Sequence, residues 1–273
     1  MRTRRSVSAR TPRRRRRLSG ALAVALLAAS VATAADAGAS RTPLDRVEGP
    51  YGRGGAAVWL IVPSRPARSL VVFGHGWKYT PPFPGHPWVD QFRPWLDHLA
   101  AGGNEIIFPA YQSGANDLAD TGRVEDYAAA IRTGYRHLGR PRVPVVVFGY
   151  SFGASLAFSY AANARAWGLP VPRAVQATFP AGMIAGAGLP PLPSMMRVLL
   201  QVGDADTEAG SAGANAFWQW LSAHPSSRKR YEIIHSTPQL AATHAAAKAT
   251  NAAARAAFWA PLDGLIAAAR SGP

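Results

Sequence analysis

Five residues near the middle of the chain, GYSFG at 149 to 153, place a serine between two glycines. Glycines on both sides of a serine let the backbone turn sharply. A serine raised on such a turn can attack a carbonyl carbon if a neighbouring histidine takes its proton. The short pattern also occurs by chance, so its surroundings decide whether Ser151 is a nucleophile.

The flanks of this motif predict a strand before it and a helix after it. VPVVVFG at 143 to 149 is a continuous apolar run, typical of a buried strand, and the sequence from 152 to 167 favours a helix. Ser151 is therefore predicted at a strand-to-helix turn, with its hydroxyl exposed above the sheet. The backbone N–H of Phe152 and the positive end of the helix dipole would face a developing oxyanion.

The rest of the chain alternates short apolar runs with longer helical patterns. We expect strands at 57–62, 69–74, 105–110, 143–149, 174–179, 197–203 and 231–235. We expect helices at 88–100, 123–138, 152–167, 213–222 and 244–269. This alternation predicts an α/β fold: a mostly parallel sheet covered by helices on both faces, with its site at the carboxyl ends of the strands.

The amino terminus has the layout of a secretory signal peptide. Nine of the 30 basic residues lie within the first 17 positions, and the apolar run ALAVALLAASVA and small-residue cleavage sites follow them. We expect cleavage after Ala34 or Ala37, a flexible lead-in over 38–56, one catalytic domain over 57–273, and a secreted or cell-envelope protein. The apolar run is shorter than the roughly 20 residues of a membrane-spanning helix.

Charge and composition exclude several classes of function. Without its nine leading arginines the chain has 21 basic and 15 acidic residues, a net charge of +6 that needs no nucleic-acid partner. It contains no cysteine, so disulfides and thiolate metal sites are excluded. No histidine and carboxylate cluster has metal-ligand spacing and no phosphate-binding glycine motif occurs, so we expect no metal and no cofactor.

A second motif, FGHGW at 73–77, follows an early apolar strand. With both motifs in this order, residues 57 to 270 resemble an α/β-hydrolase of the serine esterase or lipase type. The resemblance implies a hydrolase that cleaves carboxylic esters through an acyl-enzyme, has no large lid, and forms its oxyanion hole from the N–H groups of Trp77 and Phe152. The alternatives to an ester hydrolase are an acyltransferase, a peptidase, and an inactive binding protein of the cell envelope.

The family order is serine, then acid, then histidine, which leaves few choices after Ser151. No Asp or Glu lies between 152 and 203, and the segment VGDADTEAG follows. It resembles the family's G-x-x-D turn, which favours Asp206 as the acid; Asp204 is the alternative, with a turn-capping role. His244 follows the last predicted strand by a loop, where the family usually delivers its base, and His235, at the end of that strand, is the alternative.

Two segments are predicted to frame the mouth of the site, because each follows the carboxyl end of a strand. They are residues 78 to 88, with Tyr79, and residues 180 to 196, which are apolar throughout. Tyr79 and Tyr111 are the predicted substrate-binding residues. The apolar character of these segments favours an uncharged small-molecule or lipid ester as substrate.

Overall fold

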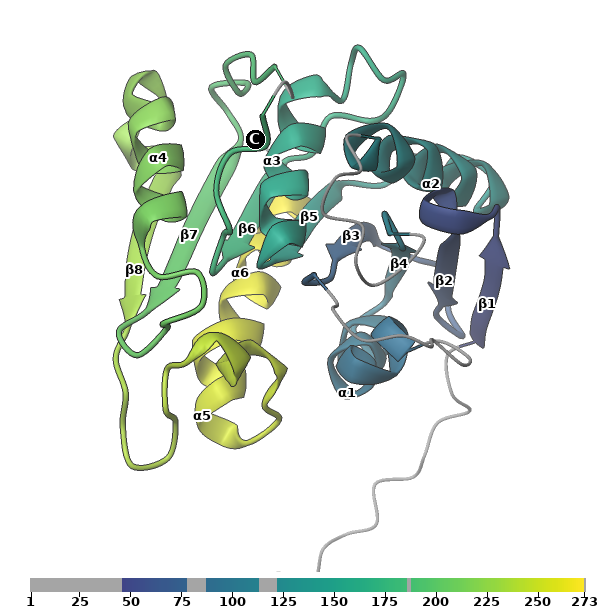
Figure 1. Ribbon diagram of the computed structural model, residues 1–273. Coiled ribbons are helices and arrows are strands. Elements are labelled where there is room, and N and C mark those ends of the chain that lie inside the picture. Colours follow the sequence, from purple (N-terminus) through teal and green to yellow (C-terminus); the bar gives the residue numbers. More distant parts are fainter. Residues whose placement is uncertain (1–45, 78–86, 113–121, 186–187, 273) are drawn as a thin grey trace, which may run out of the picture. The chain divides into compact units, whose positions relative to one another are not determined.

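A computed structural model describes residues 46–77, 87–112, 122–185 and 188–272, in which the strands form one eight-stranded sheet (Figure 1). The strand order is β1-β2-β4-β3-β5-β6-β7-β8. β2 runs antiparallel to both of its neighbours, and all pairs from β4 to β8 are parallel. The strands are β1 (Arg46–Tyr51), β2 (Val58–Val62), β3 (Ser69–Gly74), β4 (Asn104–Pro109), β5 (Val145–Tyr150), β6 (Ala174–Thr178), β7 (Arg197–Gly203) and β8 (Lys229–Ile234).

Helices cover both faces of this sheet. In Figure 1, α2, α3 and α4 lie above the sheet, and α1, α5 and α6 lie below it. The helices are α1 (Pro87–Ala101), α2 (Arg123–His137), α3 (Phe152–Asn163), α4 (Ala212–Trp220), α5 (Ala252–Ala254), a π-helical turn η5 (Arg255–Trp259) and α6 (Ala260–Arg270). Short 3-10 turns are η1 (Gly54–Ala56), η2 (Leu221–Ala223), η3 (Ser226–Arg228) and η4 (His244–Lys248).

Side chains of the central strands alternate between the two faces. On β3, Val71 and Phe73 enter the core between the sheet and helices α1 and α6. Leu70 and Val72 enter the core on the other face, between the sheet and helices α2 and α3. All four are buried. Both faces are therefore dry, which is why these strands are continuous apolar runs. The predicted α/β fold with helices on both faces is confirmed.

The connections reverse direction between β3 and β5. The chain leaves β3 through α1 toward β4 on one side, and it leaves β5 through α3 toward β6 on the other side. Gly74 and Gly149 are paired in register at the carboxyl ends of these two strands. Such a topological switch point is the usual ligand position in open α/β sheets. It lies directly beneath both sequence motifs.

The lead-in predicted as flexible over 38–56 is wrong in its described part. Residues 46 to 51 form β1, which pairs antiparallel with β2, and η1 follows. The sequence RVEGPY contains no apolar run, because β1 is an edge strand whose side chains are all exposed or half-buried. An edge strand also tolerates Pro50, which cannot donate to a ladder. The signal peptide predicted over 1–37 lies outside the described residues.

The single helix predicted over 244–269 is also wrong. The segment divides into η4, a short break, and a helix that begins at Ala252. Asn251 causes the new start, because its side-chain oxygen accepts a hydrogen bond from the backbone N–H of Ala254 at 2.8 Å. An asparagine that caps a helix competes with continuation of the preceding turn. The break is not apparent from the sequence, because alanine favours a helix on both sides of it.

A buried polar network joins the sheet to the π-helical turn. Pro261 has no N–H, so the carbonyl of Ala257, four residues before it, lacks its usual helical partner. The side chain of Gln201 on β7 donates to that carbonyl at 2.9 Å and to Glu232 at 3.0 Å. Gln176 on β6 donates to the carbonyl of Phe258 at 2.9 Å. Gln201 therefore satisfies a carbonyl that Pro261 leaves open, and Gln176 adds a second bond between the sheet and this helix.

We expect Gln201→Met to lower the free energy of unfolding by about 3 kcal/mol, because it leaves several buried polar groups without partners at roughly 1–3 kcal/mol each. Urea unfolding followed by circular dichroism measures the change. Gln219→Met, on the exposed face of α4, is the matched control and should change stability little. An equal effect of both substitutions would contradict the role of the network.

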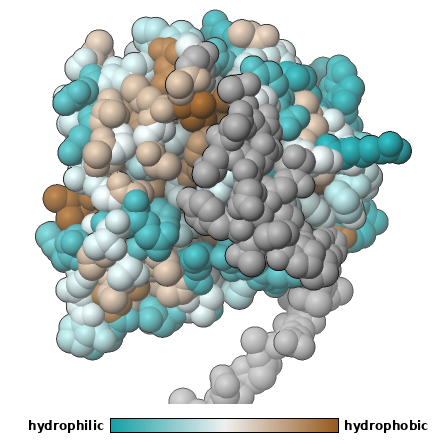
Figure 2. Space-filling view, in the orientation of Figure 1, coloured by the Kyte–Doolittle hydropathy of each residue, from teal (hydrophilic) through white to brown (hydrophobic). Residues whose placement is uncertain are grey.

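Exposed apolar side chains are few among the described residues. Met183, Met195 and Ile233 are the large ones that are more than two-fifths exposed. On the face in Figure 2, apolar residues form small patches between pale and hydrophilic ones. None of the described helices is long and apolar enough to span a membrane.

Candidate active site

Ser151 occupies the turn between β5 and α3 with a backbone conformation that few residues adopt. Its φ is 57° and its ψ is −125°, and its N–H donates to the carbonyl of Thr178 on β6 at 2.9 Å. A non-glycine residue at positive φ is strained and persists only where its surroundings hold it. This conformation raises the serine above the carboxyl edge of the sheet.

The glycines of the motif are required by close backbone approach. A Cβ on Gly149 would lie 2.5 Å from the Cα of Ala154, and a Cβ on Gly153 would overlap the carbonyl of His75. No side chain fits at either position. The glycines therefore allow α3 to start directly against the ends of β3 and β5.

The structure brings Ser151, His244 and Asp206 into one line of hydrogen bonds. His244 Nδ1 lies 2.9 Å from Asp206 Oδ2, and His244 Nε2 lies 2.8 Å from Ser151 Oγ. An ionised carboxylate only accepts, so Nδ1 carries the proton and Nε2 accepts from the serine hydroxyl. All three residues are buried. In this arrangement the imidazole is oriented to take the serine proton.

Asp206 is itself fixed by the backbone of its turn. Its Oδ1 accepts from the N–H groups of Glu208 at 2.9 Å and Ala209 at 3.1 Å. This leaves Oδ2 directed at His244. The segment from Gly203 to Asp206 therefore leads into a loop in which one carboxylate oxygen holds the turn and the other orients the imidazole.

The alternative acid and base form a separate surface pair. Asp204 Oδ2 lies 3.3 Å from His235 Nδ1, and both oxygens of Asp204 accept from Ser236. Hydrogen bonds from the Ser236 side chain and backbone lower the pKa of Asp204. Asp204 thus ties the end of β8 to the end of β7. The turn-capping role predicted for Asp204 is wrong, because the N–H groups of this turn donate to Asp206 instead.

His244 is held by its neighbours as well as by Asp206. The hydroxyl of Tyr150 donates to the His244 carbonyl at 2.9 Å. The rings of Tyr150 and Phe179 lie 5.0 and 5.7 Å from the imidazole, centroid to centroid. Sequence reasoning missed both residues. Tyr150 stands inside the motif, but no pattern shows that its hydroxyl reaches a loop 94 residues away.

We expect Tyr150→Phe to lower kcat roughly tenfold with little change in KM, because His244 loses one of the bonds that set its position. Steady-state kinetics on an ester substrate would measure this. Tyr160→Phe is the matched control, since the Tyr160 hydroxyl also donates to a backbone carbonyl, that of Pro170, but on α3 away from the site. If both variants lose stability equally and keep kcat, Tyr150 does not position the base.

The second motif lies against the serine. A Cβ on Gly76 would be 3.2 Å from Ser151 Cβ, so the turn that carries Trp77 passes beside the nucleophile. Phe152 is the first residue of α3, and its ring lies 5.6 Å from that of Trp77. The two residues predicted to donate to the oxyanion thus both lie beside Ser151. Donation by their N–H groups stays a prediction.

Tyr111 lies beneath this turn and is fully buried. Its hydroxyl donates to the carbonyl of His75 at 2.9 Å, and its ring is stacked 4.4 Å from the His75 imidazole. Both His75 ring nitrogens lie within 2.8 Å of backbone carbonyl oxygens, those of Gly76 and Ala110. These contacts favour a supporting role for Tyr111 rather than the predicted contact with substrate. Tyr79 lies outside the described residues.

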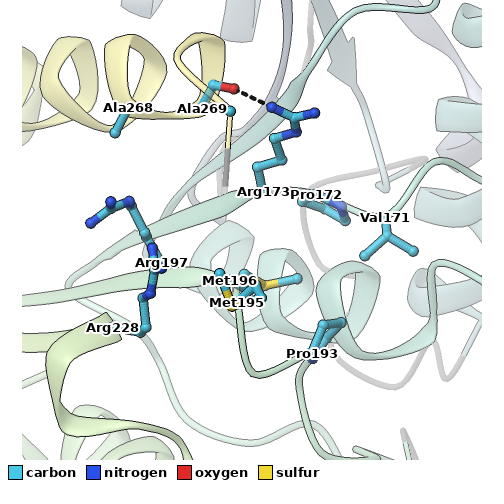
Figure 3. Close-up of a pocket in the computed structure, with 11 residues that line it drawn as sticks. Val171, Pro172, Arg173, Pro193, Met195, Met196, Arg197, Arg228, Ala268 and Ala269 are labelled. Carbon is cyan, nitrogen blue, oxygen red and sulfur yellow. Dashed lines mark hydrogen bonds between the residues drawn. The ribbon is translucent and has the colours of Figure 1, made fainter.

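The apolar segment 180–196 frames the site only at its beginning, so that expectation is corrected. It connects two parallel strands, and it must therefore run from the carboxyl edge of the sheet to the opposite edge. Met195, near its end, lines a cavity of about 220 Å³ with Arg173 and Arg197, at the amino ends of β6 and β7 (Figure 3). There Arg173 donates to the carbonyl of Ala269 on α6 at 2.7 Å. This cavity is remote from Ser151.

Across the described ranges, no group of three or more His, Cys, Asp or Glu side chains is arranged to hold a metal ion. The same ranges contain no segment that forms a separate lid domain over the carboxyl edge.

No protein-family profile matches the chain, and no curated protein matches it in sequence. Its fold is similar to that of solved structures at low identity. Esterase B of Lactobacillus rhamnosis is 16% identical, with a TM-score of 0.59 over 83% of this chain and 86% of that one. Esterase 2 of Thermogutta terrifontis, phosphoramylated by tabun, is 16% identical, with a TM-score of 0.60 over 85% and 97%.

A third similar structure is MGS-M1, an α/β hydrolase from a deep-sea metagenome library. It is 12% identical, with a TM-score of 0.57 over 84% of this chain and all of that one. Likeness at such identity establishes architecture and not activity. The chain has the α/β-hydrolase fold.

Proposed function

We propose that the protein is an exported serine hydrolase that cleaves carboxylic esters through an acyl-enzyme intermediate. The observation that carries this proposal is the line of hydrogen bonds from Asp206 through His244 to Ser151, at a strained turn on the carboxyl edge of the sheet. Two of the proteins that share the fold are esterases, which supports an ester as substrate.

In the proposed mechanism, Ser151 Oγ attacks the ester carbonyl carbon as His244 Nε2 takes the hydroxyl proton. Asp206 holds the imidazole and stabilises the imidazolium that forms. The N–H groups of Phe152 and Trp77 donate to the oxyanion of the tetrahedral intermediate. His244 then returns the proton to the leaving alcohol, and water, activated in the same way, hydrolyses the acyl-serine.

Hydrolysis of p-nitrophenyl acetate, butyrate, octanoate and palmitate tests the proposal. We expect saturable turnover, and its dependence on chain length measures the acyl pocket. We also expect an organophosphate such as paraoxon to inactivate the enzyme and to add one phosphoryl group to the peptide that contains Ser151.

The alternatives predict different results in the same assays. Transfer of the acyl group to an added alcohol in preference to water would indicate an acyltransferase. Cleavage of peptides without cleavage of esters would indicate a peptidase. A protein that is inert toward every substrate and is not phosphorylated by paraoxon would be a binding protein, and the hydrolase proposal would be overturned.

Export is part of the proposal and rests on the amino-terminal sequence. Cleavage after Ala34 or Ala37 gives a mature protein that begins at Ala35 or Gly38. Amino-terminal sequencing of the protein recovered outside the cytoplasm tests this. A protein that retains Met1 there would contradict cleavage.

A further inference from the structure

A buried arginine lies beside the candidate active site. Arg123 is the first residue of α2 and is 8% exposed. Its guanidinium carbon lies 4.3 Å from the centroid of the Trp77 ring and 5.3 Å from that of Phe152. An arginine is charged at every pH that a protein experiences. A permanent positive charge is therefore buried against Trp77 and Phe152, the two residues predicted to donate to the oxyanion.

The guanidinium lacks partners on one edge. Arg123 Nε and Nη2 are both shielded from water and have no hydrogen-bond partner, and no Asp or Glu among the described residues forms an ion pair with this side chain. A buried charge without acceptors is costly. Contact with two aromatic rings offsets only part of that cost. The edge is thus incomplete in the free protein.

The two open donors define the chemistry of the missing partner. The N–H groups of Nε and Nη2 point in the same direction from one edge of the planar guanidinium, and a carboxylate accepts both with its two oxygens. A neutral carbonyl offers a single oxygen and no charge. The open edge of Arg123 therefore fits an oxyanion with two acceptor oxygens, such as a carboxylate.

The position of Arg123 indicates where this carboxylate comes from. Phe152 follows the nucleophile directly, and Trp77 follows Gly76, where an added Cβ would lie 3.2 Å from Ser151 Cβ. Both residues are half-buried. A molecule bound at Ser151 can therefore contact the same aromatic pair that contacts the guanidinium.

We propose that Arg123 binds a carboxylate of the substrate, so that the enzyme prefers esters with a free carboxylate group over neutral esters of the same size. This inference rests on the proposed function, because it assigns a substrate class to that site. It also revises the uncharged substrate expected from the apolar loops. Both nitrogens are shielded in the free protein, so a local shift of neighbouring side chains accompanies binding.

Pairs of esters that differ only in a carboxylate and its amide test this preference. Monomethyl adipate and methyl adipamate place the group on the acyl side, and 4-acetoxybutanoate and 4-acetoxybutanamide place it on the alcohol side. Hydrolysis is followed by pH-stat at pH 7.5. We expect the wild type to prefer the carboxylate in at least one pair by about tenfold or more in kcat/KM, the effect of a charge-assisted bidentate contact.

Substitution of Arg123 attributes the preference to this residue. Arg123→Met is expected to reduce the kcat/KM ratio within the preferred pair to about one. Arg123→Lys keeps the charge without the planar fork and is expected to give an intermediate ratio. Arg132→Met, on the same helix but exposed, is the matched control and should leave the ratio unchanged.

The outcomes separate the two proposals. A wild-type ratio near one in both pairs, or a ratio that both Arg123 variants preserve, would overturn the role of Arg123 while ester hydrolysis stands. If Arg123→Met does not fold, as judged by circular dichroism, the ratio of Arg123→Lys decides. A wild type that hydrolyses neither these esters nor the neutral p-nitrophenyl esters would overturn the proposed function itself.

Discussion

Ser151→Ala is expected to lower kcat/KM for p-nitrophenyl butyrate by about 10⁴-fold or more, down to the background rate. Without Oγ no acyl-enzyme can form, and His244 has no hydroxyl proton to accept. The variant should also resist phosphorylation by paraoxon. Stopped assays over hours and mass spectrometry of the treated protein measure the two effects.

A matched serine on the same helix serves as control. Ser155 lies one turn after Ser151 and is buried, and its hydroxyl has no hydrogen-bond partner. Ser155→Ala therefore removes an oxygen at no cost in bonding and should retain full activity. If Ser151→Ala remained active while Ser155→Ala behaved like wild type, the nucleophile would have to lie elsewhere, and the acyl-enzyme mechanism would be wrong.

The strands could be predicted to the extent that they are buried on both faces. The runs that became β2 to β7 stand out because a doubly covered strand has no polar face. β8, the other edge strand, was predicted from its short apolar run, although its side chains are all exposed or half-buried. β1 fails this test, since RVEGPY is half-solvated and paired on one side only. The helix predicted over 244–269 fails for the opposite reason: alanine favours a helix everywhere, and one cap at Asn251 determines where it restarts.

Prediction of the site residues from sequence has a different limit. Ser151 could be predicted because a nucleophile turn imposes glycines at fixed offsets. Asp204 and Asp206 are of one type and lie two residues apart, so sequence left the acid open. Their separation depends on the turn: the N–H groups of Glu208 and Ala209 orient Asp206 toward His244.

The proposed role of Arg123 could not be predicted from the sequence for a further reason. An arginine at the start of a helix is unremarkable by composition. Arg123 becomes a candidate binding residue through its tertiary contacts with Trp77 and Phe152, which lie on separate segments of the chain. Only three-dimensional contacts identify a buried charge whose donors are open.

Asp206→Asn is expected to lower kcat by about 10³ to 10⁴-fold while the protein remains folded. The amide replaces an anionic acceptor with a neutral group that offers either a donor or a weaker acceptor to Nδ1. The imidazole then loses the tautomer that leaves Nε2 free to accept from Ser151, and its charged form loses a counter-ion. Steady-state kinetics on p-nitrophenyl butyrate measure the change.

Asp204→Asn is the matched control, because the same chemical change occurs two residues earlier. It should leave kcat nearly unchanged, since Asp204 contacts His235 and Ser236 and not His244. Its effect should instead appear in stability. Because Ser236 lowers the pKa of Asp204, these bonds stabilise the fold above the ordinary aspartate pKa, and the benefit is lost as pH falls through the lower folded-state value.

Thermal melts of wild type and Asp204→Asn should therefore differ at neutral pH and converge in acid. Asp206→Asn and Asp204→Asn together decide between the two acid and base pairs that the sequence left open. A large loss of kcat in Asp204→Asn, with Asp206→Asn active, would mean that the working protein uses Asp204 and His235. That result would require β8 and the following loop to rearrange, because His235 is exposed and Asp206 holds the imidazole that contacts Ser151.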